Sequence, residues 1–285
     1  MRVVAVVLSW NGREDTLACL ESLQGIDTVV VDNGSTDGSA AAVAERHPEV
    51  ELVRAGVNLG FAGGNNVGIR RALDRGADWV LLVNNDATVE PGIVDALAAA
   101  AAARPDAGVL ACKVLDAGSD RLWYAGAGFN PYLGRSRHER FGRPDEPGEL
   151  RDTVRATGAG MAVSRAAIEA AGLLDEELFL YAEDLEWCLR IREAGFAVVY
   201  VPAARVRHRV SAASGGAGSP TARYYEARNV LAVVERHRPL PRGLTAARRA
   251  VVVAPRVALA LRRPSSAAAA LRGWRDYRKG RMGRR

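Results

Sequence analysis

Short apolar segments alternate with helix-forming segments through the first 115 residues of this 285-residue chain, and this alternation constrains the fold most. Continuous aliphatic runs predict buried strands at residues 3–8, 28–31, 50–54, 79–83 and 109–114. Helices are predicted between them at residues 13–23, 37–47, 64–75 and 91–103, with Pro91 in a first turn. Strands and helices joined by short links predict an α/β fold with a mostly parallel, Rossmann-like sheet flanked by helices on both faces.

The later part of the chain is less regular. Residues 116–150, rich in Gly, Pro and Arg, predict a long excursion from the sheet. A strand is predicted at 153–164, helices at 165–171, 183–194 and 221–237, and short strands at 197–201 and 205–208. A loop of small residues is expected at 211–220.

Charge and cysteine content exclude several classes of protein. Residues 242–285 hold 13 Lys and Arg and one acid, Asp276, whereas the rest of the chain holds 26 basic and 32 acidic residues. An acidic body with a basic tail is not typical of a nucleic-acid-binding core. Three scattered cysteines cannot form a disulfide framework, which favours a reduced, cytoplasmic setting. The opening apolar run is shorter than the core of a signal peptide.

Polar segments rich in Asn, Asp and Gly follow the first four predicted strands directly. They start at Ser9, Asp32, Asn58 and Asn84. Ligands of parallel sheets bind at the carboxyl ends of the strands, where these segments would converge. The Asp32 carboxylate could accept hydrogen bonds from a nucleoside, although Asp-Asn-Gly-Ser is also ordinary turn chemistry.

The glycine-rich stretch at residues 58–68 has two interpretations. Its glycines would let a ligand approach the backbone, and Asn65-Asn66 would open a helix whose N–H groups face a phosphate. The alternative is a flexible loop. The stretch is neither a P-loop nor a dinucleotide fingerprint, because it lacks their spacing.

Two carboxylate segments are candidates for chemistry. Asp86 could hold Mg²⁺ or Mn²⁺ together with a diphosphate, or it could cap the following helix. Glu183-Asp184 follows an apolar stretch, which would raise the pKa of a carboxylate and suit a general base; acidic residues also favour a first helical turn for electrostatic reasons. His208 could complete a metal site with Asp86 or be structural, and the other histidines are taken as structural.

Together these segments resemble family 2 glycosyltransferases of the GT-A fold, closest to the rhamnosyltransferase-like branch. The matching segments are VVLSWNG (6–12), VVDNGSTD (30–37), NLGFAGGNNVG (58–68), LVNND (82–86), GAGM (158–161), YAEDLEW (181–187) and His208. Each is weak alone, but they occur in the order of the family. The resemblance implies a domain at 1–240, with a nucleotide-binding half (1–115) and an acceptor and catalytic half (116–240), and a basic, helical tail at 241–285.

The resemblance also implies residue roles. The residues implied to bind the nucleotide sugar are Ser9, Asn11, Asp32, Asn58, Gly60, Phe61, Asn65, Asn66, Asn84, Asn85 and Arg228. Asn84-Asn85-Asp86 stands where the family carries a DxD motif, with Asn84 in place of the first Asp. Asp86 and His208 would ligate Mg²⁺ or Mn²⁺. Asp184 would be the catalytic base, supported by Glu183.

The implied reaction is an inverting sugar transfer. The expected donor is a dTDP-, UDP- or GDP-linked sugar, with rhamnose as the sugar, and the expected acceptor is a glycan or a lipid-linked glycan of envelope or polysaccharide synthesis. Basic residues interleaved with Val, Leu, Trp274 and Tyr277 favour a tail lying on an anionic membrane, peripheral on its inner face; a solvated end is the alternative.

Two other functions stay open at this point. A nucleotidyltransferase that makes the activated sugar would share the fold, but it should carry a basic, glycine-rich loop after the first strand, and residues 9–13 match this poorly. A non-catalytic scaffold that binds nucleotide sugars would not need Asp86, Asp184 and His208.

Overall fold

The structure is a computed structural model that describes residues 1–209, 218–260 and 263–285. Its main sheet has the order β10-β12-β6-β11-β4-β1-β2-β3. The strands are β1 (Val3–Ser9), β2 (Asp27–Asp32), β3 (Glu51–Arg54), β4 (Trp79–Asn84), β6 (Ala107–Asp116), β10 (Arg151–Asp152), β11 (Gly160–Ser164) and β12 (Ala197–His208). Strands β1 to β4, and β6 with β12, are parallel neighbours, whereas β11 runs antiparallel between β4 and β6.

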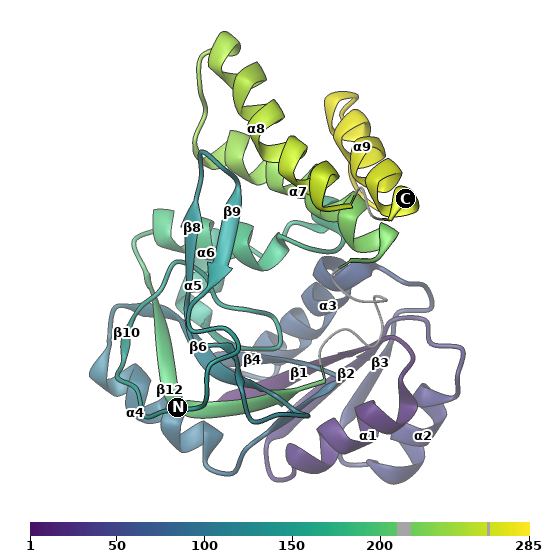
Figure 1. The fold of residues 1–285 in the computed structure, drawn as a ribbon. Helices are drawn as coiled ribbons and strands as arrows, with labels where there is room; N and C mark the ends of the chain where they lie inside the picture. The colour runs from purple at the N-terminus through teal and green to yellow at the C-terminus, as the bar shows by residue number, and fades with distance from the viewer. Residues whose placement is uncertain (210–217, 261–262) are drawn as a thin grey trace.

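Helices cover both faces of this sheet (Figure 1). The described helices are α1 (Arg13–Ser22), α2 (Ser39–Arg46), α3 (Gly60–Asp74), α4 (Ile93–Ala103), α5 (Arg165–Ala171), α6 (Glu183–Glu193), α7 (Pro220–His237), α8 (Arg242–Ala260) and α9 (Pro264–Arg278). In the view of Figure 1, α3, α5 and α6 lie above the sheet and α1, α2 and α4 below it. The expected α/β fold with a mostly parallel sheet is confirmed.

Short elements complete the sheet edge. β5 (Ala87–Val89) pairs with β12, and β7 (Leu122–Tyr124) pairs with β6. The predicted excursion at 116–150 contains β7 and a hairpin of β8 (Ala127–Asn130) and β9 (Arg135–His138), which rises beside α8 in Figure 1.

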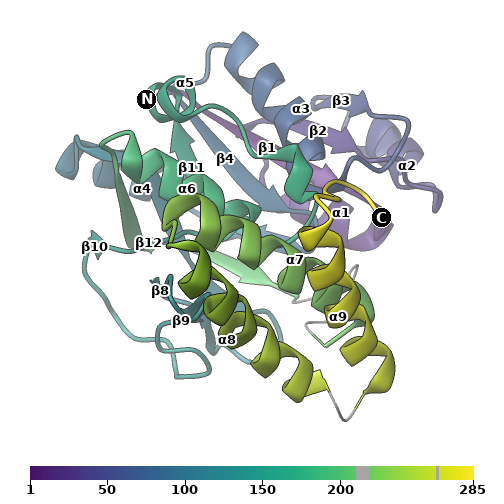
Figure 2. The ribbon, with the colours of Figure 1, turned by 90° about the horizontal axis from the view of Figure 1, so that it is seen from above.

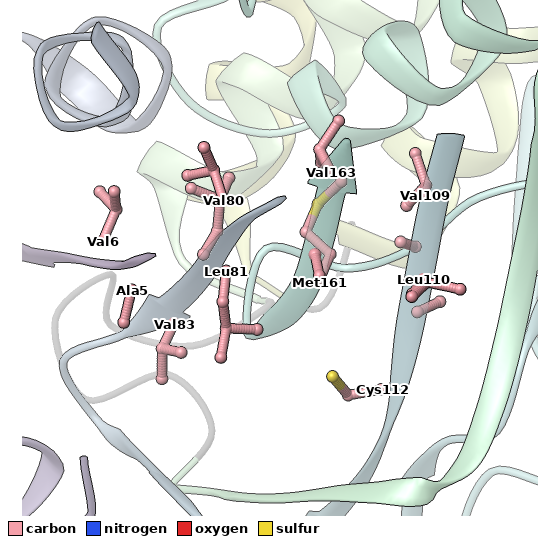
Figure 3. Close-up of a cluster of buried hydrophobic side chains, with 14 of the residues drawn as sticks. Ala5, Val6, Val80, Leu81, Val83, Val109, Leu110, Cys112, Met161 and Val163 are labelled. Carbon is pink, nitrogen blue, oxygen red and sulfur yellow. The ribbon is translucent and has the colours of Figure 1, made fainter. Parts of the chain in front are cut away.

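The core lies on both faces of the central strands. Val80, Leu81 and Leu82 on β4 are all fully buried. Figure 3 shows side chains of β1, β4, β11 and β6 projecting to both sides of the sheet. Burial on both faces explains why these strands are continuous apolar runs without alternation.

Helix α3 begins at Gly60, four residues before the predicted start, so the glycine-rich stretch is a helical turn and not a loop. A Cβ on Gly64 would lie 2.4 Å from Leu8 Cδ1, and one on Gly68 would lie 2.3 Å from Val6 Cγ1. These glycines therefore allow α3 to pack closely on β1. Helix α2 begins at Ser39 instead of residue 37, and Asp37 accepts hydrogen bonds from the Ser39 backbone N–H and hydroxyl.

Two strand predictions need correction. The strand predicted at 153–164 is formed only by Gly160–Ser164, and residues 153–159 are irregular. The two short strands predicted at 197–201 and 205–208 are one strand, β12, with an irregularity between Val201 and Arg205. Strand β12 lies between the short edge strand β10 and β6, and His208 is its last residue.

The basic tail forms α8 and α9, which pack against α7 (Figure 2). Val252 on α8 joins a buried cluster with Leu231 and Val234 of α7. A Cβ on Gly273 would lie 2.2 Å from the Tyr224 carbonyl oxygen, which places α9 directly on α7. The solvated alternative for the tail does not describe these helices. Most of the loop predicted at 211–220 falls outside the described residues.

Within the described part of the chain, no helix is both long enough and apolar enough to cross a membrane.

Candidate active site

The Asp86 and His208 side chains meet at the carboxyl end of β4. Antiparallel pairing of β5 with β12 places His208 opposite Ala87, the residue after Asp86. The Asp86 Oδ1 to His208 Nε2 distance is 2.9 Å, and the side chains are 12% and 7% exposed. Asn84, at the end of β4, has its Nδ2 atom 3.4 Å from the same imidazole nitrogen.

This pair fits a divalent metal that is shared with a ligand. A carboxylate oxygen and an imidazole nitrogen face each other. Mg²⁺ prefers oxygen ligands only, so a site with an imidazole nitrogen suits Mn²⁺ better than Mg²⁺. Among the described residues, no cluster of three or more His, Cys, Asp or Glu side chains could hold a metal. Phosphate oxygens and water would therefore have to supply the other ligands. The His208 Nδ1 atom is buried and has no hydrogen-bond partner among the described residues.

The loops after β1, β2 and β4 are tied together through Asn11. Its backbone N–H donates to Ser35 Oγ, its Oδ1 atom accepts from the Thr36 N–H, and its carbonyl accepts from Asn85 Nδ2. Asn11 itself has a left-handed backbone, with φ of 60°. Sequence-distant segments that were predicted to converge therefore do so.

Ser9 and Asp32 are the last residues of β1 and β2, where two of these loops begin. Asp32 is buried and accepts from the Ser35 N–H through Oδ1 at 3.2 Å. Ser9 is also buried, and its hydroxyl pairs with Thr16 Oγ1 at 3.1 Å. Asp32 thus shapes the turn as well as ending β2, while the Ser9 hydroxyl already has a protein partner.

Asn33, which was not singled out from the sequence, organises the next loop. Its Nδ2 atom donates to the Gly60 carbonyl and to Asn58 Oδ1, and its Oδ1 atom accepts from the Leu59 N–H. Asn58 Oδ1 also accepts from the Gly60 N–H. The only signal for this role was the position of Asn33 directly after a predicted strand.

The start of α3 does not offer a free cradle for phosphate. The N–H groups of Phe61 and Ala62 both donate to the Phe179 carbonyl, at 2.6 and 3.3 Å. A Cβ on Gly60 would lie 2.4 Å from both the ring and the carbonyl of Phe179. The segment before α6 therefore occupies the position expected for a phosphate. The Phe61 ring packs over Gly158, where a Cβ would lie 2.3 Å from the ring.

Asn65 and Asn66 lie inside α3, not at its start. The Asn65 amide donates to the Phe61 carbonyl. Asn66 donates to the Leu174 carbonyl and to Glu176 Oε1 and accepts from the Leu174 N–H. Both side chains are buried, and they hold protein segments in place. The structure does not support direct contact of Asn66 with a nucleotide sugar.

Asp184 forms an ion pair that the sequence did not reveal. Arg155 Nη2 donates to Asp184 Oδ2 at 2.9 Å, and the side chains are 15% and 12% exposed. Arg155 also contacts the Ala156 carbonyl and Ser136 Oγ of β9. A carboxylate has about four lone-pair sites, so Asp184 can hold Arg155 and still accept from an acceptor hydroxyl. Arg155 lies in the irregular stretch 153–159, where no local pattern marks it.

The sequence predicted a carboxylate with a raised pKa in this segment, and the residue with the raised pKa is Glu183. Burial, followed by the Asp184 charge, raises the pKa of Glu183 to about 8. Its Oε2 atom is buried and has no hydrogen-bond partner among the described residues. Glu183 therefore favours its neutral form, next to an ion-paired Asp184.

The residues before α6 have strained backbones. Phe179, Tyr181 and Ala182 have φ values of 60°, 67° and 69°, a region that side chains other than glycine rarely adopt. Asn229 of α7 holds this stretch, because its Nδ2 atom donates to the carbonyls of Leu178, Leu180 and Tyr181. Such strain persists only where the surroundings enforce it, and here it sets the position of Glu183 and Asp184.

Arg228 is buried and holds the same segment through hydrogen bonds to its backbone. It is 1% exposed and donates to the carbonyls of Glu177, Leu178 and Gly283. The expectation that Arg228 contacts the donor is not supported by this geometry. Arg228 connects the segment before α6 to the C-terminal residues.

Solved glycosyltransferase structures share the fold of this chain. The crystal structure of GalNAc-T7 with UDP, GalNAc and Mn²⁺ has a TM-score of 0.63 and 16% identity, over 88% of this chain and 54% of that one. The mannosyltransferase PcManGT from Pyrobaculum calidifontis, in complex with GDP-Man and Mn²⁺, has a TM-score of 0.56 and 20% identity, over 98% and 82%. The architecture is that of a GT-A glycosyltransferase.

Sequence comparison gives the family. The chain matches the family described as glycosyltransferase like family 2 over residues 2–227, and it belongs to that family. It is 34% identical over 217 residues to the N-acetylglucosaminyl-diphospho-decaprenol L-rhamnosyltransferase of Mycobacterium tuberculosis (strain CDC 1551 / Oshkosh), covering 67% of this chain and 68% of that protein. It is 26% identical to the dTDP-rhamnosyl transferase RfbF of Shigella flexneri, covering 84% and 82%.

Proposed function

We propose that this glycosyltransferase moves rhamnose from dTDP-rhamnose to a lipid-linked glycan in cell-envelope or polysaccharide synthesis, with inversion at the anomeric carbon. The observation that carries the proposal is the meeting of Asp86 and His208 at the carboxyl end of β4. The sugar and acceptor rest on the two similar rhamnosyltransferases, one named for a diphospho-decaprenol substrate and one for a dTDP donor. UDP- and GDP-linked sugars are the alternative donors.

In this proposal the loops that Asn11 ties together bind the nucleoside, with Asp32 as an acceptor for its polar groups. Asn58, Gly60 and Phe61 border the part of the site that holds the sugar of the donor. Asp86 and His208 would hold Mn²⁺, or Mg²⁺ in its place, and the bound metal would neutralise the charge of the leaving diphosphate. Asn84 and Asn85 orient this end of the site, since their amides already contact His208 and the Asn11 carbonyl.

Asp184 acts as the general base. The acceptor hydroxyl attacks the anomeric carbon from the side opposite the nucleotide, and its proton passes to the Asp184 carboxylate. One carbon–oxygen bond forms while the bond to the diphosphate breaks, so a single displacement inverts the configuration. Arg155 pairs with the Asp184 carboxylate, and burial raises the pKa of Glu183, so that a neutral Glu183 adds no second negative charge beside it.

The tail is proposed to bring the enzyme to the inner face of a membrane. Leu244 and Val251 of α8 lie two turns apart and are 59% and 46% exposed, and arginines such as Arg242 flank the helix. An exposed apolar face beside cations suits the surface of an anionic bilayer.

The direct experiment is a transfer assay with Mn²⁺, dTDP-rhamnose and N-acetylglucosaminyl-diphospho-polyprenol. The expected result is release of dTDP together with a rhamnosylated lipid whose anomeric configuration is opposite to that of the donor. UDP-glucose and GDP-mannose serve as matched donors. Release of nucleotide from another donor only, or a product with retained configuration, would contradict the proposal.

A further inference from the structure

The C-terminal end of the chain forms a strongly basic pocket. Arg272 and Arg275 lie on one face of α9, and Lys279 follows directly after the last residue of the helix. With Arg281, Arg284 and Arg285 they line a pocket of about 460 Å³ whose wall includes Tyr224. The single acidic residue of the lining is Asp276.

The positive charge of this pocket is not balanced by the protein. Asp276 accepts from the Tyr224 hydroxyl at 2.8 Å and lies 3.7 Å from Arg281. Within the described ranges, Arg272, Arg275 and Lys279 have no carboxylate at ion-pair distance. By contrast, Arg249 of α8 makes a two-pronged ion pair with Glu235. Six cationic side chains lie around one acidic side chain, and they repel one another unless an anion enters.

The pocket is joined to the active site through its own lining. Arg284 donates to the Asn58 carbonyl at 3.2 Å, and the Gly283 N–H donates to the Glu177 carbonyl at 2.7 Å. Arg285 lies over the Tyr224 ring at 4.9 Å. A residue that lines the basic pocket, Arg284, thus contacts Asn58 beside the proposed sugar site, whereas the Asp86–His208 pair is formed by other elements.

We propose that this pocket binds the diphosphate group of the lipid-linked acceptor. The inference rests on the proposed function, in which the donor diphosphate is held with Asp86 and His208. A second multivalent anion is then required at a site of its own. Arginine forks match phosphate oxygens in pairs, and several cations together suit a diphosphate rather than a single carboxylate. The acceptor is thereby recognised through its diphosphate as well as its sugar.

Pyrophosphate titrated by calorimetry, without metal, tests the pocket directly. The wild-type protein should bind one equivalent, and an Arg275→Gln/Lys279→Gln variant should bind at least about tenfold more weakly, because charge-assisted contacts are removed. An Arg242→Gln/Arg278→Gln variant removes the same charge outside the pocket lining and should bind within about twofold of wild type. Equal losses in both variants, or no binding by the folded wild type, would overturn the proposal.

Two further titrations separate the ligand sources and the two proposals. Farnesyl diphosphate should bind and compete with pyrophosphate, and phosphatidylglycerol vesicles should not displace it. Displacement by the vesicles alone would assign the pocket to lipid headgroups and contradict the inference. Asp86→Asn should weaken Mn²⁺-dependent binding of dTDP but not binding of pyrophosphate. Loss of pyrophosphate binding in Asp86→Asn would place the anion at the metal site and refute a separate pocket.

Discussion

Asp86 and His208 are 122 residues apart in the chain, yet the carboxylate and the imidazole approach to 2.9 Å because β5 pairs with the end of β12. This contact joins the segment after β4 to the end of β12. In the proposed function, these two side chains would supply two of the ligands of a metal that is shared with a diphosphate.

Asp184→Asn should abolish transfer and leave donor binding nearly unchanged. The amide cannot accept the proton of the acceptor hydroxyl, and loss of a general base costs about 10²–10⁴ in rate. The turnover number and the affinity for dTDP should be measured on the same preparation. Weakened nucleotide binding by a folded variant would show that Asp184 supports the donor instead.

Arg155→Met should lower the turnover number, whereas Arg155→Lys should restore part of it. Arg155 acts through Asp184, so loss of the ion pair should lower kcat and leave the KM for the donor nearly unchanged. Rescue by lysine with an unchanged donor KM separates this role from a purely structural one. A raised donor KM, or no rescue by lysine in a folded variant, would contradict the positioning role.

Glu183→Gln should stabilise the protein at alkaline pH relative to wild type. The pKa of Glu183 is raised from 4.5 to about 8 by burial and by Asp184. The stability contributed by its protonated form is complete below about pH 4.5 and is lost as the pH rises through 8. Urea unfolding should be measured at pH 5, 7 and 9. The free energy of unfolding of the variant should rise relative to that of wild type as the pH increases, by up to a few kcal/mol, the amount that corresponds to a pKa shift of this size.

Glu186→Gln on the same helix is the matched control, with the opposite sign. Burial alone would raise the pKa of Glu186, but hydrogen bonds from His237, Arg190 and Arg236 lower it to about 2. Its stabilising effect is present above pH 4.5 and is lost as the pH falls through 2, so its Gln variant should be less stable at neutral pH. The same response from both variants would contradict the assigned protonation states.

Asn229→Leu should reduce activity more than nucleotide binding. The substitution keeps the number and branching of the side-chain heavy atoms but removes the three hydrogen bonds that hold the strained segment before α6. Buried carbonyls that lose their donor cost about 1–3 kcal/mol, so the melting temperature should also fall. Normal turnover with a lowered melting temperature would show that the strained backbone is not needed for catalysis.

The sequence predicts the sheet and most helices because continuous apolar strands and helix stops are local signals. The motif resemblance also places Asp86 with His208, which local patterns cannot do. Prediction from the sequence fails at residues whose roles depend on tertiary contacts. Arg155 lies in an irregular stretch without periodicity, and Asn33 looks like an ordinary turn residue. Gly64 and Gly68 suggest phosphate binding, but their physical role is close packing of α3 on β1.

Asp86 and His208 are proposed to bind a metal together with the donor diphosphate. Calorimetric titration of dTDP, UDP and GDP, each with and without Mn²⁺, checks this in the wild type and in Asp86→Asn and His208→Gln. We expect dTDP to bind at least about tenfold more tightly with Mn²⁺, and we expect this gain to disappear in both variants. Binding that is equal with and without Mn²⁺, or a gain that both variants keep, would contradict it.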